Sequence, residues 1–192
     1  MDIAARAESY NTKFDKWPRL TVDKGFLLGT WMIGNYYKND TDFYGAYPHG
    51  YIGRILALFP DMSPQNILHL FSGSLKPGTG IRFDINPALG PDIVGSAETL
   101  SSCPELAGHD IRLIMADPPY SDEDATHYGT PMVNRNKVVA ECAKVLKPGG
   151  FLVWLDQAFP MYRKTELKLK GTIGLIRSTN HRVRMTFIWE RI

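Results

Sequence analysis

The sequence is poor in cysteine, with only Cys103 and Cys142 among its 192 residues. Two cysteines cannot form a disulfide framework or a zinc-ligand cluster. None of the five histidines stands at metal-ligand spacing from cysteines or acids. We therefore predict no metal site, and we expect the reducing conditions of the cytoplasm.

Long apolar runs are also missing, because none approaches the ~18 residues that a membrane-spanning helix needs. The first four residues, Met1 to Ala4, are acidic and polar rather than patterned as a secretory signal. A chain of 192 residues, 44% of them hydrophobic, is long enough for one domain with a full core. We therefore expect a single folded domain that does not associate with membranes.

An excess of one charge sign is absent overall, since the net charge is only +2, but the charges are unevenly distributed. From Met161 to Ile192, eight Lys or Arg stand against two acids, a net +6, whereas residues 1–160 carry a net −4. A basic C-terminal segment fits a polyanion such as nucleic acid. A solvated strand face would explain the same charges equally well.

Five short apolar runs, each bounded by Gly, Pro or Asp, predict strands that are buried on both faces. They are Ile67–Phe71, Ile81–Ile85, Asp92–Val94, Ile111–Ala116 and Phe151–Leu155. Apolar residues at helical spacing predict helices from Gly50 to Leu58 and from Met132 to Leu146. The second helix lies between two of the strands, which is the order of a parallel βαβ unit.

The C-terminal pattern is different, because apolar and polar residues alternate from Val183 to Glu190. This alternation predicts a half-buried antiparallel strand, paired with an earlier strand at Thr172–Ile176. A mostly parallel sheet that ends in an antiparallel hairpin is a mixed α/β sandwich. Residues 1–45 are aromatic-rich and irregular in pattern, and we interpret them as an extension of a domain formed by residues 46–192.

The strongest functional signal is Asp117-Pro118-Pro119-Tyr120, which directly follows the predicted strand Ile111–Ala116. Ligands of open α/β sheets bind beyond the carboxyl ends of strands, and two prolines stiffen the chain at this end. A nucleobase amine is a poor nucleophile. Hydrogen bonds to the Asp117 carboxylate and the Pro118 carbonyl would localise its lone pair, and Tyr120 offers a face for stacking a base. The alternative is a rigid turn that caps the strand.

This motif resembles the catalytic motif of class I S-adenosylmethionine-dependent methyltransferases that act on nucleobase amines. The resemblance covers roughly residues 45–192 and is closest to small DNA-methylase-like proteins of phages and bacteria. It implies a Rossmann-like methyltransferase sandwich, S-adenosylmethionine as cofactor, and Asp117, Pro118, Pro119 and Tyr120 as catalytic residues. The Asp-led form of the motif implies adenine-N6 in DNA as the target, whereas a Ser-led form is typical of cytosine-N4 enzymes.

The resemblance extends to a cofactor loop after the strand Ile67–Phe71. Phe71, Ser72, Gly73 and Ser74 occupy the place of the family's Asp-x-Phe-x-Gly-x-Gly loop, in which a glycine lets backbone N–H groups approach the ligand. Two residues depart from that pattern: His69 stands where an acid is usual, and Ser74 replaces the last glycine. From its apolar neighbours, we interpret His69 as a core histidine rather than a ligand.

Asp84 ends the next predicted strand, and with Ile85 it is the candidate for holding the cofactor ribose. The alternative is a residue that initiates a turn before Pro87. Asp84 follows Gly73 by only eleven residues, so that residues 72–80 leave no room for a normal crossover helix. Either a loop replaces that helix, or the strand prediction is wrong.

The remaining cofactor contacts are implied by position in the family pattern. Ser96 and Ala97 follow the third strand, where relatives contact the cofactor adenine. Pro48 precedes the first helix, where relatives cover the methionine end. Proline before a helix is also a plain start signal.

Nucleic-acid contacts are predicted in and beside the turn that joins the two C-terminal strands. The candidates are Arg177, Asn180, His181, Arg182 and Arg184. An ordinary surface turn is an equal alternative. The polar loop Ser121–Pro131 follows the catalytic motif and is placed to close over a base.

Two other functions remain open. One is methylation of an RNA base, at guanine-N2 or adenine-N6. The other is a nucleic-acid or partner-binding module that has the methyltransferase fold without its activity. The sequence has no insertion large enough for a separate target-recognition domain. Target choice would then come from residues 1–45, from loops, from a homodimer or from a partner subunit.

Overall fold

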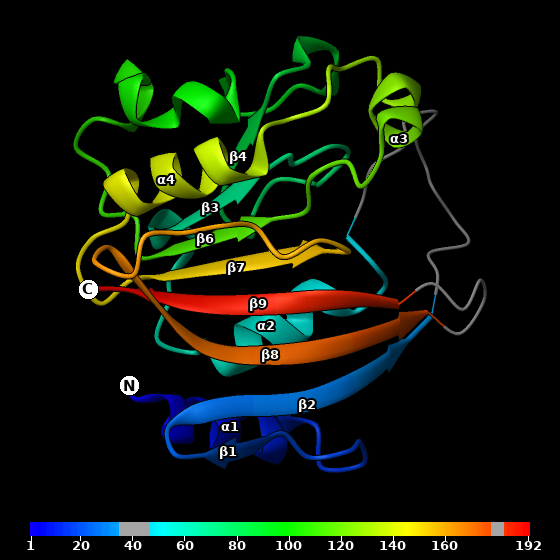
Figure 1. Ribbon diagram of the computed structural model, residues 1–192, viewed down its shortest axis with the longest axis vertical. Coiled ribbons are helices and arrows are strands. Elements are labelled where there is room, and N and C mark those ends of the chain that lie inside the picture. The colour runs from blue at the N-terminus through cyan, green and yellow to red at the C-terminus, as the bar shows by residue number, and fades with distance from the viewer. Residues whose placement is uncertain (35–46, 178–182) are drawn as a thin grey trace.

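A single nine-stranded sheet organises the protein, described by a computed structural model for residues 1–34, 47–177 and 183–192 (Figure 1). The strand order is β1-β2-β8-β9-β7-β6-β3-β4-β5. The strands are β1 Thr21–Asp23, β2 Phe26–Ile33, β3 Ile67–Leu70, β4 Ile81–Asp84, β5 Ile93–Val94, β6 Leu113–Ala116, β7 Phe151–Asp156, β8 Leu167–Arg177 and β9 Val183–Arg191. All five strands predicted from apolar runs are therefore present.

The sheet combines a parallel half with an antiparallel C-terminal hairpin. Strands β5, β4, β3, β6 and β7 run parallel to one another. Strand β9 is antiparallel to both β7 and β8. This confirms the predicted mixed α/β sandwich and its C-terminal hairpin.

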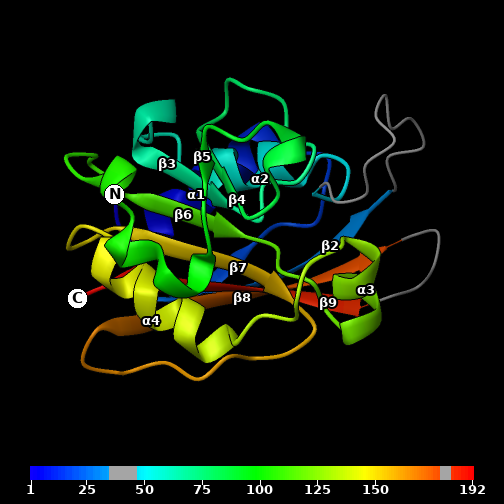
Figure 2. The same cartoon turned by 90° about the horizontal axis from the view of Figure 1, so that it is seen from above.

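Helices cover the two faces of the sheet unequally (Figures 1 and 2). The α-helices are α1 Ile3–Lys13, α2 Tyr51–Leu58, α3 Asp122–His127 and α4 Arg135–Val145. Short 3-10 helices are η1 Pro64–Asn66, η2 Pro87–Leu89, η3 Ala97–Ser102 and η4 Pro104–Leu106. Helices α1 and α2 pack into one core cluster against the sheet. Helix α4 packs into a second cluster on the opposite face, with side chains of β3, β6 and β7.

The prediction of an irregular N-terminal segment is wrong for its described part, residues 1–34. Asp2 caps α1 by accepting a hydrogen bond from the Ala5 N–H at 2.8 Å. Leu27 and Trp31 alternate into the core from β2, which pairs in parallel with β8. The tertiary contacts of these apolar side chains, rather than a strong local pattern, place the segment in the sheet.

The connection between β3 and β4 decides between the two alternatives that its short length leaves open. A loop replaces the crossover helix between β3 and β4, which still pair in parallel, so the strand prediction that contained Asp84 is correct. Gly80 is needed in that connection, because a Cβ there would lie 2.8 Å from both His69 and the Ile67 carbonyl.

The segment predicted as the loop Ser121–Pro131 is not all loop. It contains α3, whose first turn is capped by Ser121.

Candidate active site

Asp117 stands at the carboxyl end of β6, at the edge where the parallel strands end. The Tyr120 hydroxyl donates a hydrogen bond to Asp117 Oδ1. Burial raises the pKa of the Asp117 carboxyl to about 6, although Arg184 and the bond from Tyr120 lower it. The carboxylate is therefore mostly ionised at neutral pH, although its surroundings are buried.

Arg184 lies in this cluster rather than on the surface. Its guanidinium carbon is 4.2 Å from the centre of the Tyr120 ring, and the residue is only 6% exposed. The burial of Arg184 corrects its expected exposure beside the C-terminal turn, and its contact with nucleic acid stays a prediction. The side chain covers one face of Tyr120, which leaves at most the other face for a base.

A partly buried ion pair holds the turn at residues 117–120. Arg135, the first residue of α4, donates to the carbonyls of Pro119 at 3.3 Å and Tyr120 at 3.0 Å. Its Nε also donates to Asp156 at 2.7 Å, and Asp156 is fully buried at the end of β7. We call this the Arg135–Asp156 clamp. It ties the turn after β6 to the neighbouring strand, and it does not hold the carbonyl of Pro118.

Asp156 is satisfied by several further donors. Its Oδ2 accepts from the Trp154 indole at 3.0 Å, and its Oδ1 accepts from the N–H groups of Gln157 at 2.7 Å and Ala158 at 3.2 Å. Such saturation stabilises a buried carboxylate. Sequence reasoning missed both members of the clamp, because 21 residues separate them and neither belongs to a recognisable motif.

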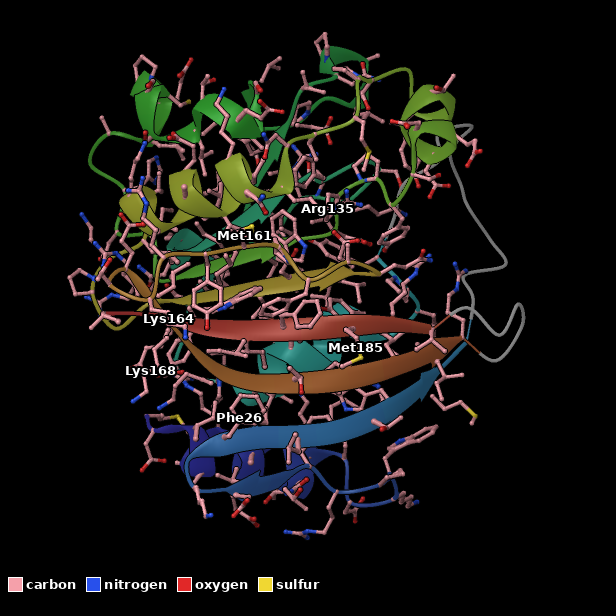
Figure 3. The ribbon with its side chains drawn as sticks, in the orientation of Figure 1. Phe26, Arg135, Met161, Lys164, Lys168 and Met185 are labelled. Carbon is pink, nitrogen blue, oxygen red and sulfur yellow. The ribbon has the colours of Figure 1, made fainter. Side chains whose placement is uncertain are left out.

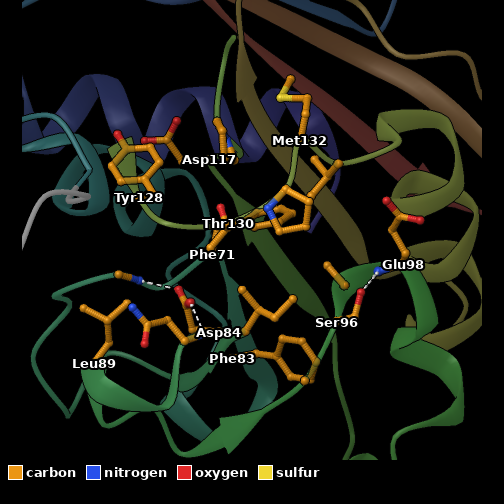
Figure 4. A pocket seen from close by; sticks show the side chains of 18 residues that line it. Phe71, Phe83, Asp84, Leu89, Ser96, Glu98, Asp117, Tyr128, Thr130 and Met132 are labelled. Carbon is orange, nitrogen blue, oxygen red and sulfur yellow. Dashed lines mark hydrogen bonds between the residues drawn. The ribbon is translucent and has the colours of Figure 1, made fainter. Parts of the chain in front are cut away.

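A pocket opens beside Asp117 and brings together most of the predicted cofactor residues (Figure 4). Phe71, Gly73, Asp84, Ile85, Ser96, Ala97 and Asp117 all line it. The remaining wall comes largely from Tyr128, Thr130, Pro131, Met132 and Val133, which follow α3. That wall was not predicted, since its residues carry no pattern beyond the polar loop in which most of them lie.

The loop after β3 is shaped by unusual backbone conformations. Phe71 has a φ of 56°, which a non-glycine residue rarely adopts, and Gly73 has a φ of 53°. Outliers of this kind cluster at functional sites, where the surroundings maintain them. Here the conformation turns the Gly73 N–H toward Asp84, which accepts its hydrogen bond at 2.8 Å.

The Asp84 carboxylate therefore has a structural role as well as a place in the pocket. Its other oxygen accepts from the N–H of Asn86 at 3.0 Å, which is the bond expected of a turn-initiating aspartate. The residue is 8% exposed. Both interpretations of Asp84 thus describe features that are present together: it initiates a turn, and its carboxylate lines the pocket.

Three predicted cofactor residues do not line the pocket. Ser72 is 2% exposed, and its hydroxyl has no hydrogen-bond partner in the described part of the chain. Ser74 lies nearby in the loop. The Pro48 carbonyl accepts from the Tyr51 N–H at 3.0 Å, as at an ordinary helix start.

His69 is a buried core residue, as predicted. Its ring nitrogens lie 3.4 Å from the Tyr47 hydroxyl and 3.4 Å from the Thr79 carbonyl. Burial lowers its pKa to about 4, so the ring is neutral at neutral pH. Among the predicted nucleic-acid contacts, Arg177 ends β8 and is half-buried. The others, Asn180, His181 and Arg182, lie outside the described residues.

Among the described residues, no three side chains of the metal-binding types are grouped as a site. Nor does any described helix have the length and apolar character needed to cross a membrane.

Comparisons with known proteins identify the fold. No protein-family model matches the sequence, and no curated protein matches it. Among solved structures, TrmN from Thermus thermophilus superposes with a TM-score of 0.53 at 15% identity, covering 77% of this chain and 50% of that protein. The chain thus spans half the length of this neighbour. The similarity confirms the predicted Rossmann-like methyltransferase fold.

Two further structures align more loosely. An rRNA methylase from Streptococcus thermophilus gives a TM-score of 0.39 at 11% identity, over 68% of this chain and 89% of that one. A TehB-like SAM-dependent methyltransferase from Corynebacterium glutamicum gives 0.42 at 12% identity, over 70% and 85%.

Proposed function

We propose that the protein transfers a methyl group from S-adenosylmethionine to the exocyclic amine of a nucleobase, and that this base is adenine, methylated at N6, in DNA. The observation that carries the proposal is that one pocket joins Asp84, at the end of β4, to Asp117, at the end of β6. A site for the cofactor ribose and an acceptor for the amine thereby adjoin one cavity. Direct transfer requires this proximity, and positioning supplies much of the rate.

The chemistry of the pocket fits a nucleoside cofactor. The Asp84 carboxylate supplies acceptors for ribose hydroxyls, and Phe83 and Ile85 supply apolar surface beside it. Gly95 keeps this wall clear, because a Cβ there would lie 2.8 Å from the Phe83 ring. When bound, the cofactor would supply a methyl group activated by a sulfonium. The Phe71–Gly73 loop, Asp84 and Ser96–Ala97 would hold it.

The catalytic turn would activate the amine. The Asp117 carboxylate and the Pro118 carbonyl each accept one N–H, which localises the nitrogen lone pair. Once the nitrogen had received the methyl group, it would carry a positive charge. Asp117, which is ionised at neutral pH, is placed to take the proton that the amine then loses. The face of Tyr120 that Arg184 does not cover would support the base by stacking.

The proposal is tested by incubating the protein with labelled S-adenosylmethionine and separate pools of DNA and RNA, followed by nucleoside analysis. N6-methyladenine in DNA is the expected product. Label in RNA alone, as N2-methylguanine or N6-methyladenine, would replace the DNA assignment and leave the mechanism intact. Retained cofactor binding without transfer to either polymer would favour the inactive module.

The pH dependence of the reaction should report on Asp117. Protonation would make Asp117 a weaker hydrogen-bond acceptor for the amine and unable to take its proton, so kcat/KM should fall as the pH drops through about 6. The bond from Tyr120 lowers the pKa of Asp117, so in Tyr120→Phe the inflection should move to higher pH. A profile that is flat between pH 5 and pH 7, roughly one unit on either side of that value, would exclude Asp117 as the acceptor.

Cofactor affinity should depend on Asp84. Replacing it with Ala removes the acceptors for the ribose, and hydrogen bonds to charged groups contribute ~1.5–3 kcal/mol, so binding should weaken roughly tenfold to a hundredfold. Calorimetry with S-adenosylmethionine measures this change. Asp92→Ala is the matched control. Asp92 is likewise a hydrogen-bonded acid near β4, which accepts from the backbone and the side chain of Arg82, but it does not line the pocket. Equal affinities in the two variants would remove Asp84 from the cofactor site.

A further inference from the structure

One face of the sheet lacks the covering helix that the strand order leads one to expect. Ten residues, 157–166, connect β7 to β8 without a helix. Helices α1 and α2 lie behind β2, β8 and β9, and within the described residues no helix lies over the front of these strands (Figure 1). We call this front surface the open face.

The open face carries apolar side chains at positions where a solvent-exposed sheet is usually polar. On β2, Leu27 and Trp31 point into the core, and the alternating positions Leu28 and Met32 are 42% and 61% exposed. On the hairpin, Val183 is 58% exposed, and Met185 packs partly buried on the same side. Contiguous exposed apolar surface of this kind marks an interaction site.

The connection between β7 and β8 adds aromatic side chains to the open face, and it also carries Met161 (Figure 3). Phe159 packs edge-on against Phe187, with ring centres 4.8 Å apart, yet remains 51% exposed. Tyr162 packs against Trp189 beside it. Met161 is 74% exposed. The rings therefore pack against β9 on one side, and Phe159 is exposed to solvent on the other.

Cations lie at both ends of this surface. At the amino end of β8, Lys164 and Lys168 are exposed, and the Arg163 side chain is 73% exposed. At the Asp117 end, Arg177 ends β8 and is half-buried. The acids of this segment are Glu166 and Glu190, and they pair with Arg163 and Lys170, respectively.

We infer that the open face binds a single-stranded segment of nucleic acid and leads it to Asp117. This inference rests on the proposed function and narrows its substrate. Cations at both ends of an apolar, partly aromatic floor match phosphates that flank unpaired bases. A duplex keeps its bases stacked inside and would gain little from such a floor. A protein partner would gain from the floor, but it would need acidic groups to match both ends.

The test uses a fluorescent oligonucleotide long enough to cross the sheet, as a single strand and as a duplex. The wild-type protein should bind the single strand more tightly. Leu28→Glu/Met32→Glu should weaken that binding roughly tenfold or more, the scale of losing stacking and apolar contact with one or two bases. In methylation of the long strand, KM should rise with kcat unchanged. Cofactor affinity, measured by calorimetry, should stay constant.

Trp17→Glu is the control, since Trp17 is 47% exposed, packs against Arg54 of α2 on the opposite side of the sheet, and adds one negative charge, as each of the two Glu substitutions does. Lys164→Ser/Lys168→Ser should reduce the salt dependence of single-strand affinity, with a log–log slope smaller by about 0.7 per cation. Equal binding by the Leu28/Met32 variant and the Trp17 variant would overturn the inference. Tighter binding of the duplex would also overturn it, as would a wild-type dimer that the Leu28/Met32 substitutions convert to monomer.

The two proposals fail in different ways. If the expected binding pattern is observed but no polymer accepts the methyl group, the inference about the open face is supported and the proposed activity is refuted. If DNA is methylated and the Leu28/Met32 variant binds like the Trp17 control, the proposed activity is supported and the inference about the open face is refuted.

Discussion

Replacing Asp117 with alanine is expected to reduce turnover by roughly a hundredfold to a thousandfold, the scale of losing one preorganised polar group at a reacting centre. The carboxylate matters most as the amine changes geometry, so the loss should appear in kcat. Cofactor affinity should change little, because Asp117 is only one of the residues that line the pocket. Single-turnover methylation and cofactor calorimetry measure the two effects separately.

Two substitutions at Tyr120 serve as controls for this result. Tyr120→Phe removes the bond to Asp117 but keeps the ring, so much activity should remain at neutral pH. Tyr120→Ala removes the ring that lies against Arg184 as well, and base placement should weaken on the ~1–3 kcal/mol scale of stacking. Full activity in Asp117→Ala would refute both the catalytic role and the proposed chemistry.

The parallel half of the fold could be predicted from sequence because its signals are local. Each buried strand is a short apolar run, and the turn at residues 117–120 follows one of them directly. The N-terminal segment could not be predicted in this way. Leu27 and Trp31 enter the sheet only because β8, about 140 residues later, offers a parallel partner. No window of the sequence contains that pairing.

Some residues of the candidate site could likewise be predicted from local sequence, and others could not. Asp117 and Asp84 stand in recognisable places at strand ends, and the pocket brings them together. The sequence predicts Arg184 beside a surface turn, on the polar side of an alternating strand, whereas the side chain is buried. Alternation distinguishes the two faces of a sheet but does not indicate whether another loop covers the strand end, as Tyr120 does here. The Arg135–Asp156 clamp depends wholly on tertiary contact and left no pattern in the sequence.

That clamp should control both stability and turnover. Asp156→Ala leaves Arg135, whose side chain is 20% exposed, without its carboxylate, and breaking a buried pair typically costs ~3–5 kcal/mol of unfolding free energy. Denaturant titration measures this loss. Lys137→Ala is the matched control on α4, because the exposed pair that it breaks with Glu98 should contribute no more than ~1 kcal/mol.

Arg135→Lys separates positioning from folding. Lysine keeps the charge near Asp156, but without the planar fork it cannot also hold the carbonyls of Pro119 and Tyr120. The protein should stay folded while kcat falls and cofactor affinity holds. Asp156 also raises the pKa of Asp117, so Asp156→Asn should move the inflection of the pH profile below that of the wild type. A purely structural clamp would leave the inflection in place, because loosened packing alone has no reason to favour the ionised form of Asp117.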